Sequence, residues 1–124
     1  MRRVRVVLVE DNEVFRDALE LLLGMRGDVE VVASVGDGAT AVAAAVEHKP
    51  DVVLVDYRMP AVDGIQATTI LLEKLPGLAI VALTASADEG QREALLEAGA
   101  VACLRKDQEL DEIVAAIRQA ASVV

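Results

Sequence analysis

The stretch Val4-Arg5-Val6-Val7-Leu8-Val9-Glu10-Asp11 decides the fold class, because a short β-branched run ends abruptly in two acids. Four more short apolar runs follow, at residues 29–35, 52–55, 78–83 and 101–104. Runs of this length and composition indicate strands that are buried on both faces of a sheet. Segments with helical periodicity separate and follow them, at residues 14–25, 38–48, 65–74, 88–98 and 109–121. The chain therefore alternates between strand and helix five times.

This alternation predicts one α/β domain over residues 1–124, with a parallel sheet and helices on both faces. Five strands in this length favour a flavodoxin-like, doubly wound (βα)5 sandwich with the strand order 2-1-3-4-5. The first helix is predicted to turn its apolar residues toward the core, namely Val14, Ala18, Leu21, Leu22 and Met25. Its polar residues Arg16, Asp17 and Glu20 are predicted to face solvent.

The composition limits the classes of function. The 124 residues carry a formal net charge of −9, and only 2% of them are aromatic. Such a chain lacks the basic footprint and the stacking aromatics of a nucleic-acid-binding domain. Cys103 is the single cysteine, which excludes an internal disulfide and suits a reducing cytoplasm. No apolar run approaches the length of a membrane span. We therefore expect a cytoplasmic domain without a membrane segment.

Polar residues follow the predicted strands at the sheet edge where the carboxyl ends of parallel strands meet. These residues are Glu10 and Asp11 after the first strand, Asp56 after the third, Thr84 after the fourth and Lys106 after the fifth. Because the first and third strands are predicted neighbours, three carboxylates and one ammonium would share a crevice with a net charge of −2. Crowded carboxylates take up protons or gather a cation, and Mg²⁺ suits carboxylate-plus-water coordination. Taken singly, each residue has a simpler explanation; Asp11, for example, could cap the first helix.

Taken together, these motifs resemble a known family. They are Val7-Leu8-Val9-Glu10-Asp11-Asn12, Val53-Leu54-Val55-Asp56-Tyr57-Arg58-Met59-Pro60, Asp63-Gly64, Ala82-Leu83-Thr84-Ala85 and the late Lys106. Their order and their positions at the strand ends resemble the receiver domain of two-component response regulators. The resemblance covers the whole chain.

The resemblance implies that Asp56 accepts a phosphoryl group from a phosphohistidine on a sensor histidine kinase or phosphotransfer protein. It implies Mg²⁺ (or Mn²⁺) held by Asp11, Asp56 and the backbone carbonyl of Arg58, with Glu10 assisting through water. Thr84 and Lys106 would bind phosphoryl oxygens, and Arg58 and Ser86 would tune the lifetime of the phosphoryl group. Such a domain assists its own phosphorylation and dephosphorylation and is not otherwise an enzyme. Phosphorylation would alter the face formed by the fourth helix, fifth strand and fifth helix, and activation as a homodimer stays open.

Two positions depart from the usual family pattern. Most members have Pro after the active-site lysine, whereas Asp107 follows Lys106 here. This feature is similar to the NarL-like branch of transcription factors with a LuxR-type helix-turn-helix, which implies DNA control through a separate domain that we do not expect within this chain. Cys103 stands where the family usually has a Tyr or Phe that changes rotamer during switching. We interpret Cys103 as a small buried hydrophobe and not as a redox sensor.

Three alternative functions also have some support in the sequence. Gly36-Asp37-Gly38 follows a strand, opens a helix and precedes Asp56 by 20 residues, as in a dinucleotide-binding domain. However, Asp37 would point a negative charge at the pyrophosphate. A phosphatase with an aspartyl-phosphate intermediate would need a second acid where Arg58 stands. A receiver-like module that binds partners without phosphorylation is disfavoured by the intact set of strand-end residues.

Overall fold

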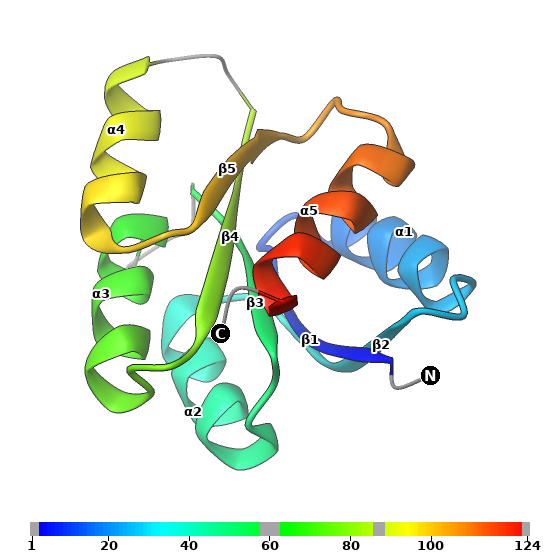
Figure 1. Ribbon diagram of the computed structural model, residues 1–124, viewed down its shortest axis with the longest axis horizontal. Helices are drawn as coiled ribbons and strands as arrows, with labels where there is room; N and C mark the ends of the chain where they lie inside the picture. The colour runs from blue at the N-terminus through cyan, green and yellow to red at the C-terminus, as the bar shows by residue number, and fades with distance from the viewer. Residues whose placement is uncertain (1–2, 58–62, 86–88, 123–124) are drawn as a thin grey trace.

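The computed structural model describes residues 3–57, 63–85 and 89–122, in which strands and helices alternate along the chain (Figure 1). The strands are β1 (Val4–Val9), β2 (Val29–Val35), β3 (Val52–Asp56), β4 (Ala79–Thr84) and β5 (Ala102–Arg105). The helices are α1 (Glu13–Gly24), α2 (Gly38–His48), α3 (Gly64–Lys74), α4 (Glu89–Ala98) and α5 (Leu110–Ser122). The strands pair in parallel in the order β2-β1-β3-β4-β5, which confirms the predicted flavodoxin-like topology. None of the described helices combines the length and the apolar character needed to cross a bilayer.

The sheet is the middle layer of three. Figure 1 shows α1 and α5 on one face of the sheet and α2, α3 and α4 on the other. Alternate residues of a strand serve opposite layers, so Val6 and Leu8 pack on the α1 and α5 side whereas Val7 and Val9 pack on the other. Strands β3 and β4 are buried along their whole length, as expected for parallel strands covered on both faces. Both core layers consist mainly of Val, Leu, Ile and Ala.

The register of the strands gathers their carboxyl ends at one edge. Val9 pairs with Val55, Asp56 with Leu83 and Thr84 with Arg105. The turn after β3 brings α3 against this edge, since a Cβ at Gly64 would lie 2.8 Å from both the Asp56 carbonyl oxygen and the Tyr57 Cα. Backbone atoms cannot move aside cheaply, so glycine at position 64 permits this close approach. The residues after β1, β3, β4 and β5 consequently share one edge of the sheet.

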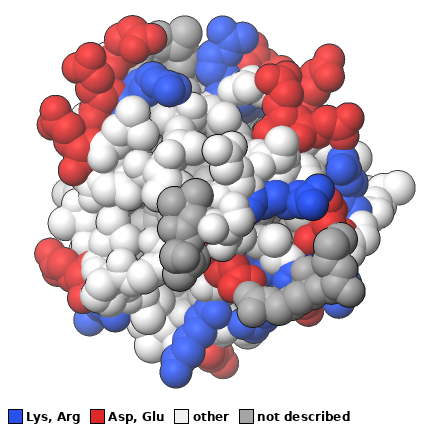
Figure 2. Space-filling model, viewed as in Figure 1, with Lys and Arg blue, Asp and Glu red and all other residues white. Residues whose placement is uncertain are grey.

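The face of the molecule drawn in Figure 2 is acidic in two places, over α4 and near the start of α5, which lie on opposite sides of the sheet. Figure 2 shows carboxylates gathered in these two places, with basic side chains between them along the upper edge and mostly uncharged surface below. In α4 the acids Glu89, Glu93 and Glu97 are exposed and spaced by four residues, so they lie on one side of the helix. This face therefore offers no continuous basic footprint for nucleic acid.

The predicted orientation of α1 is wrong. The five residues expected in the core, Val14, Ala18, Leu21, Leu22 and Met25, are exposed in the structure. Instead Phe15, Leu19 and Leu23, which recur every four residues, pack toward the sheet. Both sets follow a helical period, so the hydrophobic pattern predicts a helix without deciding which side is buried. We refer to the five exposed residues as the outer row of α1.

Substitutions at neighbouring leucines test this orientation. Leu23 is fully buried, so Leu23→Ala should lower the free energy of unfolding by about 2–5 kcal/mol. Leu21 is 67% exposed, and Leu21→Ala is the matched control, expected to change stability by no more than about 0.5 kcal/mol. Urea denaturation measures both. Equal losses from the two substitutions would contradict the orientation of α1.

Candidate functional site

Three carboxylates meet at the sheet edge, as the sequence predicts. Glu10, Asp11 and Asp56 each offer an oxygen, and these oxygens all lie within 4.8 Å of one another. Glu10 and Asp56 are buried, whereas Asp11 is exposed. The cluster therefore has a buried floor and an open side through which a small ligand could reach it.

Lys106 supplies a positive charge within the cluster. Its Nζ lies 2.7 Å from Glu10 Oε1 and 3.2 Å from Asp56 Oδ2. The ammonium also lies over the ring of Phe15, 5.0 Å from the ring centroid, which adds a favourable cation–π contact. Three carboxylates and one ammonium leave a net charge of −2, so a bound divalent cation would balance the site.

This crowding changes the proton affinity of the site. Burial, together with the neighbouring carboxyl of Glu10, raises the pKa of Asp56 to about 7, against the opposing effect of Lys106. For Lys106, burial alone would lower the pKa, but Glu10 and Asp56 outweigh it and raise the pKa above its ordinary value. Lys106 is therefore charged at neutral pH, while Asp56 exchanges its proton in the physiological range when no cation is bound.

The turn between β1 and α1 assigns separate roles to Asp11 and Asn12. Asn12 is the N-cap of α1, because its side-chain oxygen accepts a hydrogen bond from Phe15 N at 3.1 Å. The backbone amide of Asn12 in turn donates a hydrogen bond to Glu10 Oε2 at 3.0 Å. The simpler explanation of Asp11 as the helix cap is thus wrong, which leaves its carboxylate to the acidic cluster.

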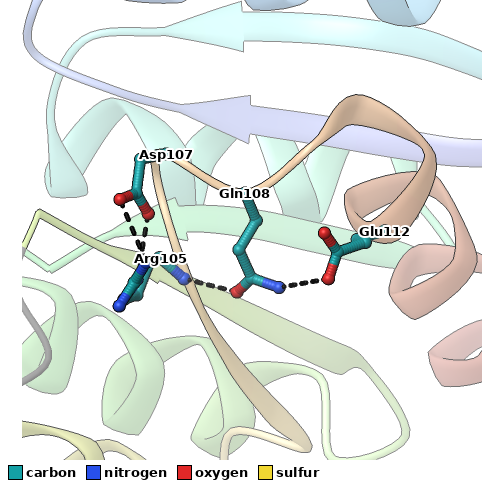
Figure 3. Close-up of polar contacts among 4 residues, drawn as sticks. All are labelled: Arg105, Asp107, Gln108 and Glu112. Atoms are coloured by element: carbon teal, nitrogen blue, oxygen red, sulfur yellow. Dashed lines mark hydrogen bonds and ion pairs between the residues drawn. The ribbon is translucent and has the colours of Figure 1, made fainter.

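The loop from β5 to α5 holds Lys106 through its neighbours. The Lys106 amide donates to the Thr84 carbonyl at 2.8 Å, and Thr84 itself is buried at the end of β4. Arg105 pairs with Asp107 through two hydrogen bonds, and the Gln108 side chain bridges the Arg105 amide to Glu112 (Figure 3). Side-chain contacts therefore shape the loop at the point where most family members have proline.

Cys103 is buried, as predicted. It belongs to the core layer on the α2, α3 and α4 side, and burial raises the pKa of its thiol. A thiol with a raised pKa is a poor nucleophile at neutral pH, which agrees with a packing role. Its carbonyl accepts a hydrogen bond from Arg92 of α4 at 2.9 Å.

The glycine motif does not form a phosphate-binding loop. Asp37 is the N-cap of α2, accepting hydrogen bonds from the amide and the hydroxyl of Thr40 at 2.7 and 2.9 Å. The hydrogen bond from the Thr40 backbone amide lowers the pKa of Asp37. A carboxylate therefore already occupies the helix N-terminus that a pyrophosphate would need. The dinucleotide-binding alternative is therefore wrong.

Residues 6–118 match the family model of the response regulator receiver domain, and the chain belongs to this family. It is 38% identical over 117 residues to the transcriptional regulatory protein LiaR of Bacillus subtilis, covering 94% of this chain and 56% of that protein. It is 32% identical over 116 residues to DegU of Brevibacillus brevis, covering 94% of this chain and 49% of that protein. The chain thus spans about half the length of these two relatives.

A solved structure supports the same assignment. The signal receiver domain of the response regulator NarL from Mycobacterium tuberculosis superposes with a TM-score of 0.94 at 33% identity, over 100% of both chains. This similarity confirms the resemblance to the NarL-like branch. Receiver domains are generally not classical enzymes.

Most of the residues predicted for the site gather there, and three further residues support them. Asp56 and Lys106 contact directly, and Glu10 and Asp11 complete the acidic cluster. Arg58 and Ser86 lie outside the described residues. The sequence did not indicate three supporting residues. The ring of Phe15 packs against the Lys106 ammonium, the backbone amide of Asn12 donates to the Glu10 carboxylate, and Arg16 donates to the Glu10 carbonyl. Their positions within the first turn after Glu10-Asp11 are the signal that could have indicated them.

The raised pKa of Asp56 predicts a pH-dependent stability in the absence of metal. Between about pH 4 and pH 7 the folded protein holds a proton on Asp56 that the unfolded chain has lost, so stability falls as the pH rises through this window. Asp56→Asn removes this loss, and in EDTA the variant should melt a few degrees above wild type near pH 8 but by a smaller margin near pH 5.

Asp17→Asn, at an exposed position of α1, provides the control and should show no such dependence on pH. A margin for Asp56→Asn that is the same at both pH values would contradict the raised pKa.

Proposed function

We propose that Asp56 is the phosphoacceptor of this receiver domain and that its phosphorylation requires Mg²⁺ at the acidic cluster. The contact between Asp56 and Lys106, within reach of two further carboxylates, supports the assignment most directly. Both oxygens of Glu10 are engaged, one by Lys106 and one by the Asn12 amide. Asp56 lies at the end of β3 beside the ammonium of Lys106. This ammonium can stabilise the negative charge of a phosphoryl group bound to Asp56.

The residues present suit a hard divalent cation. Carboxylate oxygens are the ligands that Mg²⁺ and Mn²⁺ prefer, and the net charge of −2 would be balanced by one such ion. Asp11 and Asp56 would bind the ion directly, and Glu10 would act through water. The backbone carbonyl of Arg58, outside the described residues, completes the proposed set.

Phosphoryl transfer needs positioning and charge stabilisation more than proton chemistry. The Asp56 carboxylate attacks phosphorus, and the new O–P bond forms as the P–N bond of the donor phosphohistidine breaks and its electron pair returns to the imidazole. Lys106 neutralises the phosphoryl oxygens, and the Thr84 hydroxyl donates one directed hydrogen bond to them. When bound, Mg²⁺ supplies further positive charge, which favours the ionised form of Asp56. Arg58 and Ser86 would tune the later hydrolysis.

Intact-mass analysis after incubation with acetyl phosphate and Mg²⁺ tests the proposal. Wild type should gain one phosphoryl group, whereas Asp56→Asn should gain none, because the nucleophile is absent. Asp11→Ala should be labelled at least about tenfold more slowly, since it loses a metal ligand. Asp17→Asn should behave as wild type. Stoichiometric labelling of Asp56→Asn would refute the assignment.

The phosphodonor that we propose is a sensor histidine kinase or a phosphotransfer protein, and the outer row of α1 is the surface for it. The row begins at Val14, three residues after Asp11, so a protein that presents a phosphohistidine to Asp56 would cover it. Val14 is 82% exposed and Met25 is 75% exposed, and burial of such side chains favours association.

Val14→Ser and Leu21→Ser separate docking from chemistry. Both positions are exposed, so the substitutions should leave acetyl phosphate labelling unchanged. Transfer from purified, autophosphorylated sensor-kinase fragments should slow several-fold for whichever fragment phosphorylates wild type. Asp17→Asn, on the same helix, is the control. Unchanged transfer would remove the outer row from the proposed contact surface.

The output of the domain belongs to the proposal as well. Because the relatives are transcription regulators, we propose that phosphorylation controls transcription through a separate DNA-binding domain, in the cytoplasm and with homodimer formation as one route. The face of α4, β5 and α5 would carry the signal. Cys103 is smaller than the usual aromatic at its position, so the movement of Thr84 toward the phosphoryl group would rearrange β5 less than an aromatic residue allows.

A further inference from the structure

Gly36 is the member of the glycine motif that the cap of α2 does not explain. Asp37 caps that helix and Gly38 begins it, whereas Gly36 precedes both. A Cβ at position 36 would lie 2.6 Å from Arg16 Nη1 and 3.7 Å from Arg16 Cζ. The side chain that passes over Gly36 therefore comes from α1, on a different part of the chain.

Arg16 reaches across this glycine to the end of β1. Its Nη1 donates a hydrogen bond to the carbonyl oxygen of Glu10 at 2.9 Å. The sequence predicts Arg16 to face solvent, but in the structure it is half-buried against the β2–α2 turn. The contact joins α1 to the residue that begins the acidic cluster.

Every other polar group of Glu10 is also held. Its amide donates to the Val35 carbonyl at 3.0 Å, Oε1 meets Lys106, and Oε2 accepts from Asn12. Arg16 fixes the remaining group, the carbonyl of the peptide that leads into Asp11. The orientation of this peptide plane sets the direction in which the Asp11 side chain leaves the backbone.

Asp11 depends on that orientation more than its neighbours do. Its side chain is exposed, and none of the hydrogen bonds or ion pairs among the described residues holds it. Glu10 and Asp56, in contrast, are buried and contact Lys106. The backbone at residue 11 must therefore aim this carboxylate.

We infer that Arg16 is a positioning residue for the metal site and that residue 36 is glycine so that Arg16 can reach the Glu10 carbonyl. The inference rests on the proposed function, because it concerns the aim of Asp11 at the proposed cation. It assigns Gly36 a role unrelated to nucleotide binding, namely room for a guanidinium.

Charge alone predicts the opposite effect of removing Arg16. The guanidinium is positive, so its loss would strengthen the attraction of the acidic cluster for a divalent cation. Positioning predicts that its loss weakens binding, because Asp11 is no longer aimed. The sign of the change in Mg²⁺ affinity therefore distinguishes the two explanations.

Gly36→Ala is the decisive variant, since it keeps the charge of Arg16. The atom that the new Cβ meets is the end of a flexible side chain, so the guanidinium can move away without breaking the fold. Mg²⁺ titration by calorimetry, with the fluorescence of the single tyrosine Tyr57 as a second readout, should show affinity reduced roughly three- to tenfold. The melting temperature in EDTA should stay within a few degrees of wild type.

Four further variants complete the test. Gly24→Ala is the matched control, because a Cβ there meets nothing within 4 Å, and it should leave Mg²⁺ affinity unchanged. Arg16→Ala should weaken binding as Gly36→Ala does, and Arg16→Lys should restore part of the loss. Because Gly36 acts through Arg16, Arg16→Ala combined with Gly36→Ala should bind no more weakly than Arg16→Ala alone.

The outcomes separate this inference from the proposed function. Wild type that binds no Mg²⁺ would refute the metal site and the inference with it. Wild type that binds Mg²⁺, with Gly36→Ala and Arg16→Ala at unchanged or higher affinity, would overturn the positioning role alone. A lower melting temperature in EDTA with unchanged affinity would identify Arg16 as a purely structural brace and would also overturn it.

Discussion

Crowding of negative charge at one edge of the sheet is the constraint on which this structure depends. Glu10 is completely buried as a carboxyl group, and its 2.7 Å contact with Lys106 compensates for part of the cost of that burial. The compensation is incomplete at Asp56, because burial and the neighbouring carboxyl of Glu10 raise the pKa of Asp56 to about 7 although Lys106 lies 3.2 Å away and opposes the rise. The site is thus poised for a cation, and the strand order creates that condition by placing β1 beside β3.

The fold was predictable from the sequence because its signals are redundant. Five short aliphatic runs and five helical segments determine a doubly wound sheet even when single boundaries shift by a residue or two. The orientation of α1 was not predictable, because Val14, Leu21 and Met25 repeat with the same helical period as Phe15, Leu19 and Leu23. Only the sheet beneath the helix selects between two apolar sides, and the pattern of one helix contains no information about it.

For the candidate site, the sequence predicts which residues gather there but not the side-chain contacts that support them. Strand-end positions follow from topology, so the sequence alone predicts that Asp56, Thr84 and Lys106 lie at one edge of the sheet. The contacts of Phe15 and Arg16 depend on how far a side chain reaches and in which rotamer, which spacing along the chain does not encode. The role of Gly36 is hidden in the sequence for the same reason. A glycine that makes room for a side chain from another element and a glycine that makes room for a phosphate look the same in a sequence.

Hydrogen bonds around Lys106 connect the residues beside Asp56 to β4 and to α5. The Lys106 amide is bound to the Thr84 carbonyl, so β4 and β5 end in a shared hydrogen bond directly beside the two side chains proposed to contact a phosphoryl group. Beyond Lys106, Gln108 links the Arg105 amide to Glu112 in the first turn of α5 (Figure 3). A displacement of Lys106 is therefore shared with Thr84 on one side and with α5 on the other. The family pattern predicts an aromatic ring at position 103, where this chain has Cys103. The hydrogen bonds that join the Lys106 amide to β4 and the Arg105 amide, through Gln108, to α5 do not depend on the size of the side chain at position 103.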